Sequence, residues 1–272
     1  MLQLDQTKLD ELKNFAEELA DAARQVILPY FRKQNSIVCK TTDSPSGQPV
    51  TDADLKAETV MRKLISNRYP DHGIIGEEFE DINPDADLSW VLDPIDGTRA
   101  FIAGLPLFGT LIGLGLKGKP ILGILDQPIL KERFIGMGSK STLNGKKIRT
   151  RQCLSLADAV HATTDPRMMV GSTQQAMLHK LMRLTRMTQF GGNCYAYGML
   201  AAGSIDIIVE NDLKPWDTFA LIPIIQGAGG VVTSWSGKPA INSPHVLACG
   251  NKQLHSDVLP NFARDRSEPG EA

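Results

Sequence analysis

The chain has 272 residues, 42% hydrophobic and 22% charged, so it can bury the core of a globular protein. Its 29 lysines and arginines nearly balance 31 acidic residues without a basic patch, which argues against a nucleic-acid polymer as partner. The first residues lack the basic and apolar regions of a signal peptide, and no apolar run reaches membrane-spanning length. We therefore expect a cytoplasmic protein without a membrane partner.

The first half of the chain predicts two helices followed by a mostly antiparallel sheet. Apolar residues recur at three- and four-residue steps over residues 7–32 and again over 51–67, which is typical of amphipathic helices. The polar loop at residues 41–49 is dense in turn residues, and we expect it to be mobile. Apolar runs bounded by turns predict strands at residues 36–40, 73–76, 107–116, 120–126 and 133–137.

The second half alternates between strands and helices, which predicts an α/β layer packed on the first half. We expect strands at residues 159–163, 188–190, 205–210, 231–234 and 246–249. We expect helices at residues 171–187, 195–202 and 215–227, and a last helix from about residue 252. Residues 1–272 then form a single unit with subdomains at about 1–150 and 151–265 and a frayed tail at 266–272.

The stretch Trp90-Val91-Leu92-Asp93-Pro94-Ile95-Asp96-Gly97-Thr98 places two carboxylates at the end of a buried strand. Asp93 and Asp96 flank Pro94, which we expect to stop the strand because proline has no N–H to donate. Gly97-Thr98 then forms a tight turn that exposes backbone N–H groups before a helical run. Such a junction suits a hard cation on one side and an anion on the other.

Three further acidic residues lie at the edges of predicted elements. Asp54 has the spacing of a capping-box partner, Glu77 also fits a solvated strand end, and Asp217 also fits a helix-dipole partner. Each residue alone therefore has a purely structural explanation. Together with Asp93 and Asp96, they form a set of carboxylates at element edges, which favours a metal site.

A glycine-rich run at residues 113–118 spells the dinucleotide fingerprint, and its extension to Pro120 nearly spells a P-loop. No helix is predicted after it, and Pro120 stands where the P-loop needs a hydroxyl, so a strand–turn–strand explains these glycines. The five histidines and four cysteines are scattered without metal-ligand spacing. We therefore assign neither a zinc site nor a disulfide scaffold.

Three motifs together resemble the inositol monophosphatase family in their order and spacing. They are Gly76-Glu77-Glu78, the stretch at residues 90–98, and Trp216-Asp217 followed by Ala228-Gly229-Gly230. The resemblance covers nearly the whole chain. It implies an α/β (α+β) protein with the layered αβαβα sugar-phosphatase fold, a magnesium-dependent phosphoric monoester hydrolase, and a homodimer.

Residues 98–113 and 190–198 resemble the histidinol-phosphatase branch of that family more than the inositol branch. This implies hydrolysis of L-histidinol phosphate to L-histidinol and phosphate, a step of histidine biosynthesis. Relatives in that branch often carry Asp where this chain has Asn193. The alternatives are a phosphatase for inositol 1-phosphate or another small monoester, including a nucleotide 3'-phosphate, and a non-catalytic phosphate- or metal-binding regulator. The regulator is disfavoured because none of the motif residues is replaced.

The resemblance also implies roles for individual residues. Asp93 would bridge two magnesium ions about 3.5–4 Å apart, and a third magnesium is left open. The attacking water would lose its proton through Thr98 to Asp54 or Glu77, and the N–H groups of Gly97 and Thr98 would bind the phosphoryl oxygens. The implied metal ligands are Glu77, Asp93, the Ile95 carbonyl, Asp96 and Asp217. The implied substrate contacts are Asn193, Glu210 and Asp217, and Arg99 and Lys40 are weaker candidates that solvent-exposed charge explains equally well. Glu210 would face inositol hydroxyls nearly as well as a histidinol amine, so it does not discriminate between these substrates.

Overall fold

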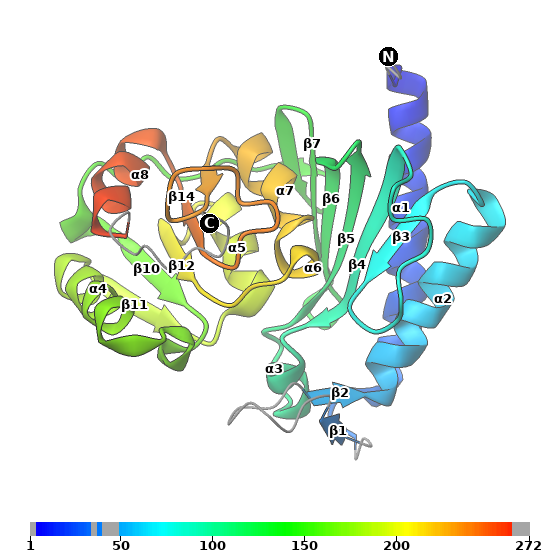
Figure 1. Ribbon diagram of the computed structural model, residues 1–272, viewed down its shortest axis with the longest axis horizontal. Coiled ribbons are helices and arrows are strands. Elements are labelled where there is room, and N and C mark those ends of the chain that lie inside the picture. The colour runs from blue at the N-terminus through cyan, green and yellow to red at the C-terminus, as the bar shows by residue number, and fades with distance from the viewer. Residues whose placement is uncertain (1–3, 34–36, 40–48, 263–272) are drawn as a thin grey trace.

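The computed structural model describes residues 4–33, 37–39 and 49–262, and Figure 1 shows that they form five alternating layers of helices and sheets. Two helices cover the outer face of a larger sheet, further helices separate it from a smaller sheet, and two more cover the far side. This arrangement confirms the predicted αβαβα fold. The helices of the three layers are α1 (Gln6–Ile27) and α2 (Asp52–Arg68), then α5 (Asn193–Ala201) and α7 (Leu221–Ala228), then α4 (Gly171–Leu184) and α8 (Lys252–Val258).

The larger sheet has seven strands in the order β3-β4-β5-β6-β7-β8-β9 among the described residues. β3 (Gly73–Gly76) runs parallel to β4 (Leu88–Asp96), and every later pair is antiparallel, as the first half of the sequence predicted. Because parallel strands end at the same edge, the residues that follow β3 lie beside the end of β4. The other strands are β5 (Gly109–Leu116), β6 (Lys119–Gln127), β7 (Glu132–Met137), β8 (Lys140–Leu143) and β9 (Lys146–Lys147).

The smaller sheet has five strands in the order β11-β10-β12-β14-β13 within the described part of the chain. β10 runs parallel to both of its neighbours, whereas β14 is antiparallel to β12 and β13. The carboxyl ends of β10 and β12 therefore lie side by side. These strands are β10 (Val160–Thr163), β11 (Met187–Phe190), β12 (Ile207–Glu210), β13 (Val231–Thr233) and β14 (Val246–Cys249).

Prolines explain where two helices differ from the predictions. The helix expected to reach residue 32 ends at Ile27 and continues only as a 3₁₀ turn, which contains a proline in its first positions. The helix expected at 215–227 is divided into α6 (Pro215–Thr218) and α7. Pro223 has no N–H to donate to the Phe219 carbonyl four residues earlier, so the helical ladder is interrupted.

The middle core of the protein draws on both halves of the chain. Side chains of β5, β6 and β7 pack there against α5, α7 and β12, so the two sheets are held at a fixed separation. The glycine run is explained by this packing, because a Cβ atom at Gly113 would lie 2.7 Å from the Phe219 ring. α6 in turn packs against β4, which brings its first turn to the edge of the larger sheet.

Some expectations fall outside the described residues. They are the polar loop at 41–48, Lys40 and the tail at 266–272. Within the described ranges, none of the helices combines the length and the apolar composition that crossing a bilayer requires.

Candidate active site

An irregularity in the pairing of β4 forms the centre of the site. Asp93 pairs with Leu111 of β5, and pairing resumes at Asp96 opposite Gly109, so the register shifts in between. The expectation that Pro94 would stop the strand is wrong, because β4 continues to Asp96 around the irregularity. The Thr110 hydroxyl donates a hydrogen bond of 2.8 Å to the Pro94 carbonyl and so stabilises this part of the strand.

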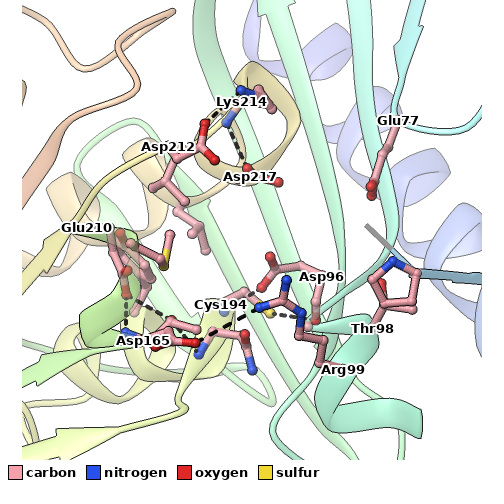
Figure 2. A pocket seen from close by; sticks show the side chains of 18 residues that line it. Glu77, Asp96, Thr98, Arg99, Asp165, Cys194, Glu210, Asp212, Lys214 and Asp217 are labelled. Carbon is pink, nitrogen blue, oxygen red and sulfur yellow. Dashed lines mark hydrogen bonds and ion pairs between the residues drawn. The ribbon is translucent and has the colours of Figure 1, made fainter. Parts of the chain in front are cut away.

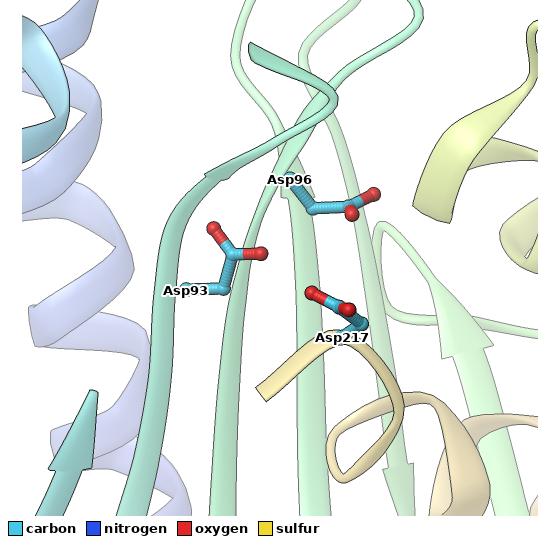
Figure 3. Close-up of side chains that lie close together, drawn as sticks. All are labelled: Asp93, Asp96 and Asp217. Carbon is cyan, nitrogen blue, oxygen red and sulfur yellow. The ribbon is translucent and has the colours of Figure 1, made fainter. Parts of the chain in front are cut away.

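Three aspartates meet at this point. Carboxylate oxygens of Asp93, Asp96 and Asp217 lie within 4.8 Å of one another, and Figure 3 shows the three groups facing a common centre. Asp217 comes from the first turn of α6, where its Oδ2 accepts the Lys214 backbone N–H at 2.7 Å. The backbone N–H of Cys194, in α5, donates to Asp96 Oδ2. Elements far apart in the sequence therefore converge on one cluster.

The cluster has the electrostatics of a cation site. Burial and mutual repulsion raise the pKa values of Asp93 and Asp217 well above the usual range, and burial raises the pKa of Asp96 to about 6. Among the described residues, no lysine or arginine forms an ion pair with Asp93 or Asp96. Buried carboxylate oxygens without a basic partner fit a hard divalent cation such as Mg²⁺.

Glu77 faces the same centre from the end of β3. It lines a cavity of about 480 Å³ together with Asp96, Thr98 and Asp217. Figure 2 shows Glu77 and Glu210 on opposite sides of this cavity. Glu77 lies outside the group of oxygens within 4.8 Å of one another, but after burial its charge contributes most to the raised pKa of Asp93.

Asp54 caps α2 and also contacts Thr98 at the edge of the cavity. Its Oδ2 accepts the backbone N–H of Thr51 at 2.9 Å, which completes the predicted capping box of α2. Its Oδ1 lies 3.5 Å from the hydroxyl of Thr98, and the same hydroxyl lies 3.1 Å from the Ile95 carbonyl. Burial raises the pKa of Asp54 to about 6. One carboxylate thus caps a helix and contacts the edge of the cavity.

The turn at residues 97–98 requires glycine for two reasons. Gly97 has φ of 89°, in the left-handed region, and a Cβ atom there would lie 2.9 Å from the amide group of Asn193. Asn193 Nδ2 donates to the backbone carbonyls of Leu107 at 2.7 Å and Gly191 at 3.3 Å. The Asn193 side chain is therefore held by these two carbonyls, packs against the turn at Gly97 and also lines the cavity.

Glu210 lies at the far wall of the cavity, at the end of β12. Its Oε1 accepts the backbone N–H and the hydroxyl of Thr164, both at 2.8 Å, whereas its buried Oε2 has no hydrogen-bond partner. Burial raises the pKa of Glu210 to about 8. Arg99 is half exposed, and its Nη1 lies 4.0 Å from Asp165 Oδ2.

The sequence reasoning missed Thr164, Asp165 and Tyr197, which also line the cavity. Thr164 follows β10, whose carboxyl end lies beside that of β12, so the alternating strands and helices offered a signal for it. Tyr197 is buried on α5, and its hydroxyl has no hydrogen-bond partner. No sequence signal distinguishes it from an ordinary core tyrosine.

The five alternating layers, the carboxylate cluster at the edge of the larger sheet and the sequence together place the chain in a class of metal-dependent phosphatases. The sequence model of the inositol monophosphatase family matches residues 8–267, and the chain belongs to this family. The family acts on phosphoric monoesters and depends on metal ions, typically Mg²⁺.

Individual relatives agree with this membership. The chain is 44% identical to the chloroplastic bifunctional phosphatase IMPL2 of Arabidopsis thaliana, over 96% of this chain and 77% of that protein. It is 31% identical to a histidinol-phosphatase of Chlorobaculum parvum, over 92% of this chain and 97% of the relative. An inositol monophosphatase structure from Zymomonas mobilis is 40% identical and superposes with a TM-score of 0.83, covering 93% of this chain and 98% of the other.

Proposed function

We propose that this phosphatase hydrolyses L-histidinol phosphate to L-histidinol and phosphate, a step of histidine biosynthesis. The observation that carries the proposal is Glu210, whose buried Oε2 has no partner on the cavity wall opposite Glu77. With a pKa of about 8, Glu210 is mostly protonated in the free protein, and the ammonium or imidazolium of bound histidinol would stabilise its carboxylate form through charge-assisted hydrogen bonds. The likeness to a histidinol-phosphatase adds support. Inositol 1-phosphate and other small monoesters, including nucleotide 3'-phosphates, are the alternatives.

The metal site that we propose takes its ligands from both strands at the sheet edge and from α6. Asp93 would contribute to two Mg²⁺ positions. A titration with Mg²⁺ would show whether a third position is occupied. When bound, Mg²⁺ stabilises charge on the phosphoryl group and lowers the pKa of water. The proposed ligand set is Glu77, Asp93, the Ile95 carbonyl, Asp96 and Asp217.

The proton route that we propose runs through Thr98 to Asp54. The Thr98 hydroxyl lies 3.5 Å from Asp54 Oδ1, which supports Asp54 as the terminal acceptor, with Glu77 as the alternative. With a pKa of about 6, Asp54 is ionised at neutral pH and can accept a proton. The backbone N–H groups of Gly97 and Thr98 would contact the phosphoryl oxygens.

The organic part of the substrate would occupy the opposite half of the cavity. Glu210 is its main polar contact in this proposal, and Asp217, which also belongs to the proposed metal ligands, lines the same cavity. Arg99 sits at the half-exposed rim, where its Nη1 lies 4.0 Å from Asp165 Oδ2. Asn193 would contribute mainly by supporting the turn at Gly97.

A substrate panel tests this assignment. With Mg²⁺, phosphate release should be faster from L-histidinol phosphate than from inositol 1-phosphate or a nucleotide 3'-phosphate at equal concentration. Glu210→Gln should lower kcat/KM for histidinol phosphate roughly 10–100-fold, because it removes a charge-assisted hydrogen bond, and should affect a monoester without an amine much less.

The matched control is Glu132→Gln, since Glu132 bonds the Tyr195 hydroxyl at 2.7 Å and does not line the cavity. This variant should keep the wild-type substrate ranking. A preference for inositol 1-phosphate in the wild-type enzyme would contradict the histidinol assignment and favour the inositol alternative.

We also propose that the protein is a homodimer, as its family resemblance implies. Apolar side chains are exposed on the edge strand β11, at Met187 (50% exposed) and Phe190 (39%), and at the two ends of α4, at Val170 (71%) and Leu184 (41%). Such exposed apolar side chains support a contact between two copies of the chain. Light scattering after gel filtration should give twice the chain mass of 29.7 kDa, and Met187→Lys should weaken the association. A mass of one chain at micromolar concentration would contradict the proposal.

A further inference from the structure

α2 buries a row of ionisable side chains that the mechanism above uses only in part. Asp54, Glu58 and Arg62 follow one another at four-residue steps, so they share one face of the helix, and all three are buried. Buried charges are costly unless they are paired and hydrogen-bonded. Asp54 contacts Thr51 and Thr98, but neither Glu58 nor Arg62 lines the cavity.

Glu58 and Arg62 instead bind the backbone that follows Glu77. Arg62 Nε donates to Glu58 Oε1 at 2.7 Å, and Glu58 Oε2 accepts the backbone N–H of Glu78 at 2.9 Å. The two remaining nitrogens of the guanidinium donate to the carbonyls of Phe79 at 2.9 Å and Glu80 at 2.8 Å. The planar fork of arginine suits this arrangement, because one side chain can hold three acceptors at once.

Gly76, the first residue of the Gly76-Glu77-Glu78 motif, makes room for this pair. A Cβ atom at Gly76 would lie 2.1 Å from Glu58 Oε1 and 2.7 Å from Arg62 Nη2. The Glu58–Arg62 ion pair therefore packs directly against the backbone at the end of β3. This contact explains why the motif begins with glycine.

We propose that Glu58 and Arg62 are positioning residues that hold the Glu77 carboxylate toward the aspartate cluster. The pairing of β3 with β4 fixes the chain before Glu77, and the Glu77 N–H donates to the Leu92 carbonyl at 3.2 Å. The ion pair fixes the chain immediately after it. The inference rests on the proposed function, because there Glu77 is a ligand of Mg²⁺.

Electrostatic repulsion gives a reason to fix the backbone on both sides of Glu77. Asp93, Asp96 and Asp217 are acidic like Glu77, and their carboxylate oxygens lie within 4.8 Å of one another, so ionised carboxylates gathered here repel one another until a cation binds. An unrestrained glutamate would turn away and would have to be brought back at each binding event. A backbone held on both sides keeps the ligand in place beforehand, which strengthens binding.

The test compares Glu58→Gln and Arg62→Lys in the full-length protein. Calorimetric titration with Mg²⁺ alone, without substrate, should show binding roughly 10–100-fold weaker than in the wild type. The Mg²⁺ concentration for half-maximal hydrolysis should rise by a similar factor, while kcat at saturating Mg²⁺ changes little. Arg62→Lys keeps the charge, so it carries the test if Glu58→Gln does not fold.

Asp206→Asn is the matched control, because Asp206 is also buried, bonds Arg151 and accepts the Val160 backbone N–H at 2.7 Å. It lies at the opposite end of β12 from Glu210, so it should lose thermal stability but keep wild-type Mg²⁺ affinity. Wild-type affinity in both test variants, or an equal loss in Asp206→Asn, would overturn the inference. Weakened Mg²⁺ binding without hydrolysis of histidinol phosphate by the wild type would contradict only the proposed substrate.

Discussion

Asp93→Asn is expected to abolish Mg²⁺ binding and to lower kcat/KM by on the order of 10³-fold or more, while the protein stays folded. The reason is that Asp93 lies deepest in the carboxylate cluster and faces both Asp96 and Asp217. Lewis-acid stabilisation of a phosphoryl transition state is worth several kcal/mol, and each 1.36 kcal/mol is about tenfold in rate. Calorimetry with Mg²⁺ and a phosphate-release assay measure the two effects separately.

When a chelator removes Mg²⁺, the Asp93→Asn substitution should stabilise the folded protein relative to the wild type. Burial and Glu77 raise the pKa of Asp93 in the folded protein, so its favourable contribution exists at low pH and is lost as pH rises through the folded pKa. Asparagine carries no charge and avoids this loss. Metal-free Asp93→Asn should therefore have a higher Tm than the metal-free wild type at pH 8, and the difference should shrink toward pH 4.

Two results would contradict this account. Turnover close to the wild-type rate in Asp93→Asn would show that Asp93 does not bridge the proposed metal positions. An equal Tm of the metal-free proteins at pH 8 would show that the cluster is not strained by its own charge. Asp212→Asn is a suitable control, because Asp212 lines the cavity rim at an exposed position outside the cluster.

Asp54→Asn is expected to lower kcat roughly 10²–10⁴-fold, the usual contribution of a general base. Asparagine cannot take up the proton that the Thr98 hydroxyl would relay, but its Oδ1 can still accept the Thr51 N–H, so the helix cap should survive. The variant should also lose the acidic limb of the pH–rate profile. That limb belongs at or below pH 6, because the pKa of Asp54 is about 6 and a bound cation would lower it further.

Asp52→Asn provides the comparison, since Asp52 lies in the same first turn of α2 but is only half-buried. Its rate and its pH–rate profile should match those of the wild type, with at most a small loss of stability from the helix dipole. If Asp54→Asn kept both turnover and the acidic limb, the proton would have to reach Glu77 instead.

The larger part of the fold was predictable because its signals are local. The amphipathic periodicity of α1 and α2 and the turns between β5, β6 and β7 lie within short stretches of sequence. The aspartate cluster was predictable through the family motifs, which carry Asp93, Asp96 and Asp217. Pro223 indicated the break between α6 and α7. One continuous helix was predicted instead, because the apolar spacing continues across the break.

The supports of the site were not predictable, because they depend on packing between distant segments. Nothing in the sequence of α2 says that Glu58 and Arg62 meet the backbone of residues 78–80. The alternation of strands and helices gave only a general signal for Thr164, because its contact with Glu210 depends on β10 and β12 being parallel neighbours. The second function of Asn193, to hold the Leu107 carbonyl, likewise needs the position of α5.

The irregular pairing of β4 settles which side of the sheet its carboxylates face. In a regular strand, side chains alternate, so residues three positions apart such as Asp93 and Asp96 would point to opposite faces. Between them β4 spans three steps while β5 spans only two, from Leu111 to Gly109. This one extra residue reverses the alternation and brings both carboxylates to the same side. The number of residues between the two aspartates, and not only their identity, therefore creates the site.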